Sequence, residues 1–357
     1  MEDRVAGIAI WDDEGRRDLV KYLSDLKSIL YDSSPEKGKS PEKALDPILA
    51  LELQIEGIYD HHKANNNFAQ WQNLDFGPEG FLGKFFDKLK WLAVHAPCRM
   101  NRNICALDEN VRRWSVDETC RALDFSYKIG AKGLVLHAGR VDYWGDFNKE
   151  TRDKMEASFY KSFKEISEHY ITRRYAGNNV EGKGLDLLIE NLEVPNLIST
   201  RTEHERAYIT CAQILSDVID KKRGPHEVQN GVRMLVDFSH YWNVHITLKN
   251  NKDKSFVPGY DEIVNTNIID YIKNVFYNNS QKIDACHMGG CYNTNPRVTH
   301  GVISPIARHY EFNELNLNDI LSVPQILEKP IILEVFNVDP KMLIFSHQNV
   351  MNFMKSK

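Results

Sequence analysis

The sequence contains no apolar run that approaches the roughly 20 residues a helix needs to cross a bilayer. Its first residues, Met1 to Arg4, also lack the pattern of a secretory signal peptide. Positive charge is not in excess, because 45 Lys and Arg residues face 50 Asp and Glu residues, for a formal net charge of -5. Such a chain has no global basic field to attract nucleic acid, so binding a polyanion would need a local basic patch. We therefore expect a cytoplasmic protein with no membrane partner.

Several common motifs are missing as well. The six cysteines form no CxxC pair, and we expect reduced thiols. No P-loop occurs, and no GxGxxG motif follows the first expected strand, which removes support from the nucleotide-binding folds. What remains is an ordinary globular composition, with 42% hydrophobic and 27% charged residues. A chain of 357 residues can bury one large core or two smaller ones.

Short apolar segments alternate along the chain with stretches of helical spacing. The expected strands are 5–11, 51–55, 91–94, 133–136, 185–189, 232–236, 283–286 and 330–333. The expected helices are 19–30, 115–129, 151–170, 203–221, 260–277 and 340–354. Eight strands alternating with helices predict one α/β domain over residues 1–357, a (β/α)8 TIM barrel. A doubly wound open sheet is the alternative.

The chain is longer than the ~250 residues of a plain barrel. We expect the surplus in loops near 31–50, 98–115, 241–260 and 288–312. Three of these follow strand ends, on the face where a substrate would bind. Ser115 to Glu118 has the form of a capping box, which predicts that a helix begins there. Gly130 suits the left-handed end of the same helix.

Metal-ligand side chains stand at the ends of most of the apolar runs. The carboxyl ends of barrel strands meet at one mouth, so residues far apart in the sequence would lie together there. The residues expected at this mouth are His95, His137, Glu190, Asp237, His240, His287 and Glu334. His300, beyond the seventh strand, is expected to fold back over the same mouth.

This set of imidazole nitrogens and carboxylate oxygens suits zinc, and also manganese or iron(II), better than calcium or magnesium. Three carboxylates packed in a barrel mouth repel one another unless a cation lies between them. Two or three divalent ions would resolve this repulsion, with Glu190 or Glu334 as a bridging ligand. Any single histidine could instead be a hydrogen-bonded core residue, but ligands at six of eight strand ends favour metals.

The order of the motifs resembles that of a known group of enzymes. The motifs are His95-Ala-Pro97 with Asn101, His137-Ala-Gly139, Glu190-Asn191, Asp237-Phe-Ser-His240, His287 and Ile332-Leu-Glu334. They span roughly residues 90 to 336 and resemble the xylose-isomerase-like barrel superfamily, most of all the endonuclease IV family of apurinic/apyrimidinic endonucleases. The resemblance implies that one zinc is bound by His95, His137 and Glu190, and a second by Glu190, Asp237, His287 and Glu334. It also implies that His240 and His300 bind a third metal.

Two positions depart from that family. Val298 stands where the family has an aspartate two residues before the last histidine, so Asn293 or Asn295 would have to substitute as a ligand of the third metal. Cys98 stands where the family has an aromatic residue that inserts into the DNA duplex. Duplex binding is therefore expected to be weaker than in other family members.

Two classes of function compete. The first is a hydrolase that cleaves a phosphodiester, for which abasic sites in DNA are the implied substrate and clustered metals generate the hydroxide. Its candidate catalytic residues are Glu190, Glu334 and His240. Its expected substrate-binding residues are Arg99, Asn101, Arg140 and Arg297. Phosphate contacts are expected from these arginines and from Arg102, Arg112 and Arg113.

The second class is an isomerase or epimerase acting on a small sugar or sugar phosphate. The superfamily's epimerases hold one metal with Glu, Asp, His and Glu, which Glu190, Asp237, His287 and Glu334 would match. There the two glutamates move a proton as acid and base. His95 and His137 favour the hydrolase, which is the function predicted from the sequence, whereas Cys98 and the acidic net charge favour the isomerase.

Overall fold

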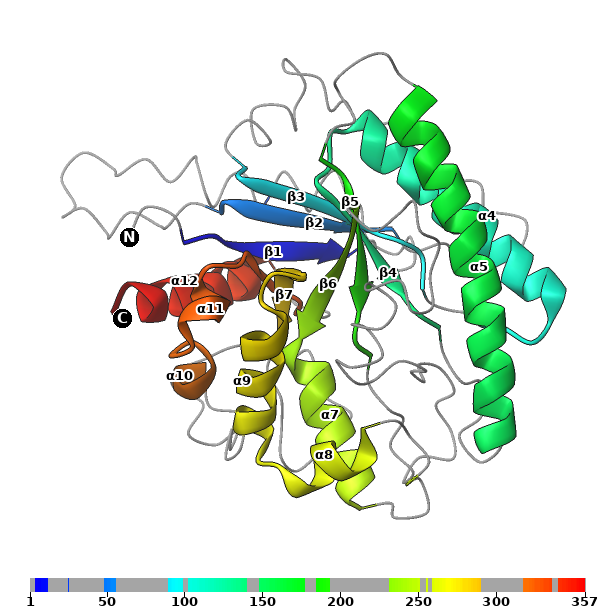
Figure 1. Cartoon of the computed structure of the whole chain (residues 1–357). Helices are drawn as coiled ribbons and strands as arrows, with labels where there is room; N and C mark the ends of the chain where they lie inside the picture. The colour runs from blue at the N-terminus through cyan, green and yellow to red at the C-terminus, as the bar shows by residue number, and fades with distance from the viewer. Residues whose placement is uncertain are drawn as a thin grey trace.

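Eight parallel strands close into a barrel in which each strand pairs with the next along the chain and β8 pairs with β1 (Figure 1). This computed structural model describes residues 4–11, 25, 48–55, 89–98, 102–139, 148–176, 184–192, 231–250, 255, 259–289, 317–335 and 340–356. The strands are β1 (Ala6–Trp11), β2 (Ala50–Gln54), β3 (Trp91–His95), β4 (Gly133–His137), β5 (Asp186–Glu190), β6 (Val232–Asp237), β7 (Ile283–Met288) and β8 (Ile331–Leu333). The predicted TIM barrel is confirmed, and the open-sheet alternative is wrong because the sheet closes.

Side chains alternate between the inside of the barrel and the layer under the helices, as the two-residue period of a strand requires. The inward-facing positions carry a small apolar cluster made of Ala9, Ala50, Trp91, Ala93, Val135, Leu188, Leu235, Ala285 and Ile332. Two residues further along most of these strands, the next inward position is polar. The barrel interior therefore has an apolar floor and a polar mouth at the carboxyl ends of its strands.

Gly7 lies where β1 and β2 approach closely. It pairs with Ala50, and a Cβ added at Gly7 would overlap the carbonyl oxygen of Ala50. Backbone cannot move aside as a flexible side chain can, so the two strands would have to separate. Because overpacking a core costs about 1–3 kcal/mol or more, we expect Gly7→Ala to lower the free energy of unfolding by about 3 kcal/mol. Denaturant titration measures this value.

Gly130→Ala is the control for this prediction. Gly130 has a positive φ of 69°, but a Cβ added there meets no atom within 4 Å. Its expected cost is only the left-handed backbone penalty of about 1 kcal/mol. Equal losses in the two variants would contradict the close approach of β1 and β2.

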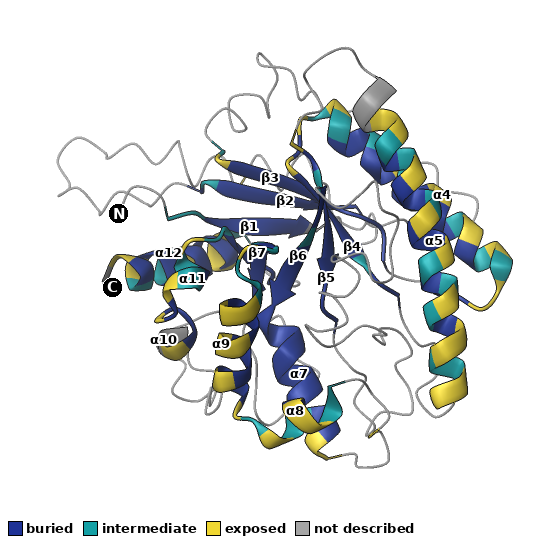
Figure 2. Cartoon of the chain, in the orientation of Figure 1, coloured by how far each residue is buried: buried dark blue, intermediate teal, exposed yellow. Residues whose placement is uncertain are grey.

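Helices cover the outside of the barrel, with buried residues towards the strands and exposed residues outward (Figure 2). They are α4 (Glu109–Lys128), α5 (Lys149–Ala176), α7 (Phe238–Lys249), α8 (Tyr260–Asn265), α9 (Ile268–Asn279), α10 (Leu317–Ile320), α11 (Pro324–Leu327) and α12 (Pro340–Ser356). The long helices α4 and α5 lie side by side, and α12 packs against β1 and β8. No helix within these ranges is long and apolar enough to cross a bilayer.

The predicted start of the first long helix is wrong. Helix α4 begins at Glu109, because the Asp108 carboxylate accepts hydrogen bonds from the backbone N–H groups of Asn110 and Val111. Ser115 lies inside the helix, where its hydroxyl donates to the carbonyl oxygen of Val111 instead of capping a terminus. The loop expected near 98–115 is shortened accordingly. The end of the helix is as predicted, with Gly130 in the left-handed conformation.

Two further boundaries differ from the prediction. The loop expected near 241–260 is largely the helix α7, which begins directly after β6. The helix expected over 260–277 is two helices, because Thr266 is extended and the side chain of Asn267 caps α9 through the N–H of Ile269. The helix expected at 203–221, all of the helix expected at 19–30 except residue 25, and most of the loops near 31–50 and 288–312 lie outside the described residues. The single-domain extent of 1–357 stays a prediction.

Candidate metal centre at the barrel mouth

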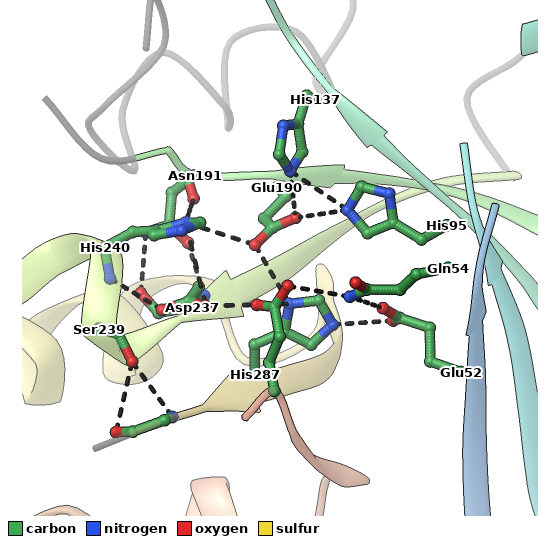
Figure 3. Close-up of polar contacts among 12 residues, drawn as sticks. Glu52, Gln54, His95, His137, Glu190, Asn191, Asp237, Ser239, His240 and His287 are labelled. Atoms are coloured by element: carbon green, nitrogen blue, oxygen red, sulfur yellow. Dashed lines mark hydrogen bonds and ion pairs between the residues drawn. The ribbon is translucent and has the colours of Figure 1, made fainter. Parts of the chain in front are cut away.

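Seven side chains that the sequence places at strand ends lie together at the carboxyl end of the barrel (Figure 3). They are His95 from β3, His137 from β4, Glu190 from β5, Asp237 from β6, His240 from α7, His287 from β7 and Glu334 just after β8. Five further predicted site residues lie outside the described part of the chain. These are Arg99, Asn101, Arg140, Arg297 and His300.

Glu190 lies at the centre of this group and directs its two carboxylate oxygens to different partners. Its Oε2 is 3.3 Å from His95 Nε2 and 3.1 Å from His137 Nε2. Its Oε1 is 3.1 Å from His287 Nδ1 and 3.3 Å from His240 Nδ1. One carboxylate therefore faces two sets of ligands, which is the geometry of a bridging ligand.

The first set of ligands surrounds Nδ1 of His287. Glu334 Oε2 lies 3.2 Å and Asp237 Oδ2 lies 3.9 Å from this nitrogen, in addition to Glu190 Oε1. One ligand atom from each of these four buried residues lies within 4.8 Å of the others. Ligand atoms at about 2.1 Å from a tetrahedral zinc lie about 3.4 Å apart, so the four side chains are spaced to hold one ion.

The hydrogen bonds of two histidines, His95 and His240, leave one ring nitrogen of each for a metal. The Nδ1 of His95 is 2.8 Å from the carbonyl oxygen of Ala96, which can only accept, so Nδ1 carries the proton and Nε2 faces Glu190. In the same way the Nδ1 of His240 donates to the carbonyl oxygen of Asn191 at 2.7 Å. Such second hydrogen bonds fix the tautomer and the ring orientation of metal-binding histidines.

Asn191 and the start of α7 hold Asp237 in place. The backbone N–H of Asp237 donates to Asn191 Oδ1 at 2.7 Å, and Asn191 Nδ2 donates to the Asp237 carbonyl oxygen at 2.9 Å. Asp237 Oδ1 accepts from the backbone N–H of His240 at 2.8 Å and caps α7. Asp237 Oδ2 is buried and accepts no hydrogen bond from the described residues. A cation beside it would offset the cost of leaving this oxygen without a donor.

The buried charges raise the pKa values of two members of the group, His95 and Asp237. Burial alone lowers the pKa of His95, but its hydrogen bond to Glu190 and the nearby carboxylates outweigh burial and raise the pKa to about 9. Burial and the charges of Glu334 and Glu190 raise the pKa of Asp237 to about 7. Without a metal, protons on these groups neutralise the carboxylates. A divalent cation can replace the protons, and its binding releases them.

Comparison with known proteins finds similar solved structures but no similar sequence family. No protein-family model and no curated protein matches the chain. Among solved structures, a D-psicose 3-epimerase determined in the presence of D-fructose has a TM-score of 0.53 at 14% identity, covering 99% of this chain and 98% of that chain. The likeness covers the whole (β/α)8 barrel and shows that the two chains share this fold. A 3-keto-D-glucoside 4-epimerase from E. coli has a TM-score of 0.54 at 9% identity and covers 99% of this chain and 100% of its own.

Endonuclease IV from Thermus thermophilus is similar at the same level. Its TM-score is 0.50 at 10% identity, with 99% of this chain and 100% of that chain covered. Likenesses at such identities show the fold alone. The resemblance inferred from the sequence motifs therefore holds for the architecture, and the function has to be argued from the site.

Two buried polar residues on β2 belong to this site and were not predicted from the sequence. Glu52 Oε2 is 2.8 Å from His287 Nε2. This contact keeps the ring proton on Nε2, so Nδ1 is the nitrogen that faces the ligand set. Gln54 Nε2 donates to Glu52 Oε1 and to Glu334 Oε1, both at 2.9 Å. Both residues are essentially inaccessible to solvent. Glu52 and Gln54 thus orient two of the four ligands without being ligands themselves.

We expect Glu52→Ala to weaken metal binding by about 10–100-fold, the usual cost of removing the partner that orients a metal-binding histidine. Competition with a chromogenic chelator measures the affinity. Asp284→Ala is the control, because Asp284 precedes His287 on β7 at a partly exposed position outside the site. Unchanged affinity in a folded Glu52→Ala protein would contradict the positioning role.

Two of the arginines expected to contact phosphate are buried and interact with other side chains of the protein. Arg112 is buried between α4 and α5, where it pairs with Glu109 and Glu165. The buried guanidinium of Arg102 lies 4.7 Å from the ring centroid of Trp114. The prediction that Arg102 and Arg112 contact a substrate is therefore wrong. Arg113 is exposed on the outside of α4, where it pairs with Glu109.

Proposed function

We propose that the protein is a divalent-metal-dependent isomerase or epimerase whose substrate is a sugar or sugar phosphate. The proposal rests on one observation, that two glutamates lie at a site whose ligand atoms are spaced to hold one metal ion. Glu190 and Glu334 both lie within 3.2 Å of the same imidazole nitrogen of His287, and Asp237 completes the set. We infer that zinc, manganese or iron(II) occupies this set, since those ions accept mixed nitrogen and oxygen ligands.

The chain's own residues can perform the proton transfers that such a reaction needs. A divalent cation held by Glu190, Asp237, His287 and Glu334 would polarise a carbonyl or hydroxyl pair of the substrate. One glutamate then removes the proton from the carbon beside the carbonyl. The other glutamate returns a proton, either to the opposite face of that carbon or to the neighbouring carbon, and in the second case the hydroxyl proton of the first carbon passes to the former carbonyl oxygen. The first outcome is epimerisation and the second is isomerisation.

The electrostatics of the mouth favour a sugar over DNA. Among the described residues, four buried carboxylates line it: Glu52, Glu190, Asp237 and Glu334. Of the arginines considered for phosphate contacts, Arg112 pairs with Glu109 and Glu165, and Arg102 lies over the ring of Trp114. DNA affinity depends largely on cationic contacts to phosphates, so an acidic mouth in an acidic chain opposes it. Epimerases of D-psicose and of 3-keto-D-glucoside are among the proteins of similar fold.

Phosphodiester hydrolysis is the second candidate, and one observation favours it. His95 and His137 direct their Nε2 atoms at Glu190 Oε2, so a second ligand set shares Glu190 with the first. Paired metal sites of this kind are common in enzymes that cleave phosphodiesters. Endonuclease IV is among the proteins of similar fold.

A substrate panel tests the proposal. Metal-loaded protein is incubated in D2O with ketoses and ketose phosphates, and separately with a DNA duplex that contains an abasic site. We expect sugar interconversion with deuterium incorporated at the reacting carbon, and no strand cleavage. Strand cleavage without conversion of any sugar would overturn the proposal in favour of the hydrolase.

A further inference from the structure

We propose that Cys98 is a thiolate ligand of a metal ion that His95 and His137 also bind. One ligand atom from each of these three residues lies within 4.8 Å of the others. The mouth would then hold a sulfur-containing metal site next to the carboxylate-rich site of Asp237, His287 and Glu334. This inference goes beyond the sugar reaction and requires neither of the two candidate functions.

The backbone fixes the approach of Cys98 to the two imidazoles. Directly after β3, the carbonyl oxygen of His95 accepts from the N–H of Ile55, and the N–H of Ala96 donates to the carbonyl oxygen of Val135. The chain is thereby tied to both neighbouring strands just before Cys98. Cys98 is largely buried, with 9% of the residue exposed. These backbone hydrogen bonds to the two neighbouring strands therefore fix where Cys98 lies.

The remaining ligand atoms at this position already face one another. His95 Nε2 is 3.2 Å from His137 Nε2, and both nitrogens lie within 3.3 Å of Glu190 Oε2. The hydrogen bond from His95 Nδ1 to the Ala96 carbonyl makes Nε2 the nitrogen that a metal would bind in place of its proton. Adding the sulfur of Cys98 gives two imidazoles and one thiolate. Glu190 Oε2, which lies beside both imidazole nitrogens, would supply an oxygen as the fourth ligand, and zinc accepts such a set.

The two neighbouring sites would differ in their metal preference. A thiolate with two imidazoles is a soft set that selects zinc or cobalt, whereas three carboxylates with one imidazole are harder and also suit manganese. We therefore infer that the His95, Cys98 and His137 site fills with zinc or cobalt even when manganese occupies the other site. Binding converts the thiol to a thiolate and releases its proton to solvent.

Cobalt(II) is the probe for this site, because a thiolate bound to it gives a charge-transfer band in the near ultraviolet. Metal-stripped protein is titrated with cobalt(II), first alone and then after loading with manganese. We expect the band in the wild type under both conditions. It should be absent in Cys98→Ser and present in the control Cys120→Ser, which changes a partly buried cysteine of α4.

Zinc affinity should fall by at least about 10–100-fold in Cys98→Ser, since losing a ligand costs no less than losing its orienting partner. Cobalt binding to the wild type without a charge-transfer band would overturn the proposal, and so would a band that persists in Cys98→Ser. If Cys98→Ser does not fold, Cys98→Ala is used, and the wild-type spectrum remains decisive. The readout needs no turnover, so it is separate from the test of the sugar reaction.

Discussion

Glu190→Ala is expected to remove most of the bound metal and to abolish activity while the barrel stays folded. Within the described part of the chain, Glu190 is the one carboxylate that faces both ligand sets, with Oε2 towards His95 and His137 and Oε1 towards His287. Losing it removes a ligand from each. We expect metal affinity to fall by more than about 100-fold, beyond the cost of losing an orienting partner. Elemental analysis after dialysis measures the bound metal.

The fold should survive because Glu190 lies at the end of β5, above the apolar floor of the barrel. The histidines beside it can release their protons when the carboxylate is absent, so no buried positive charge remains without a partner. The metal-free variant should therefore unfold near the temperature of metal-stripped wild type. Unfolding far below that temperature would argue for a structural role. Asp186→Ala, at the other end of the same strand, is the control and should retain its metal.

The barrel and most of its mouth were predictable because two simple periods recur in the sequence. Apolar segments of strand length alternate with helical spacing, which gives the eight strands. Within a strand, inward positions recur every second residue, so His95 follows Ala93 and His287 follows Ala285. A ligand at the end of each run was therefore visible without any structure.

Glu52 and Gln54 follow the same rule but were not predicted. Leu51, Leu53 and Ile55 face the helix layer, so the polar residues between them face the interior. An alternating strand is typical of a sheet with one solvated face, and in that context its polar residues carry no chemistry. Only the closed barrel shows that the polar face of β2 is the interior. Alternation of this kind in a chain of parallel strands is the signal that could have identified them.

The errors concern features that depend on side-chain direction. The Ser115 motif fits a capping box, yet Asp108 caps the helix earlier and leaves Ser115 in its interior. Arg102 and Arg112 lie near the expected substrate loop in sequence, but their side chains turn into the packing of α4. Sequence spacing places a residue along an element and cannot say which ion pair its charge will join. That choice is made by the neighbouring helix, here through Glu165 of α5.

Glu334→Gln should lower kcat by about 1,000-fold, within the 10²–10⁴ that a positioned general acid or base contributes. The change keeps the shape of the side chain, and Gln54 Nε2 can still donate to its amide oxygen as it does to Glu334 Oε1. Glu190, Asp237 and His287 remain to hold the cation. What is lost is a carboxylate that can take up and return a proton, so kcat should fall much more than KM rises.

Measurements at saturating metal separate this role from simple ligation. If Glu334 acts only as a ligand, added metal should restore the activity of Glu334→Gln. If it moves the proton, kcat stays low when the site is full, and deuterium exchange from D2O into the substrate falls in parallel. Glu328→Gln, an exposed position just after α11, is the matched control and should retain wild-type rates. A loss of less than tenfold in metal-saturated Glu334→Gln would leave Glu190 as the single proton-transfer residue, and the proposed use of two glutamates would be wrong.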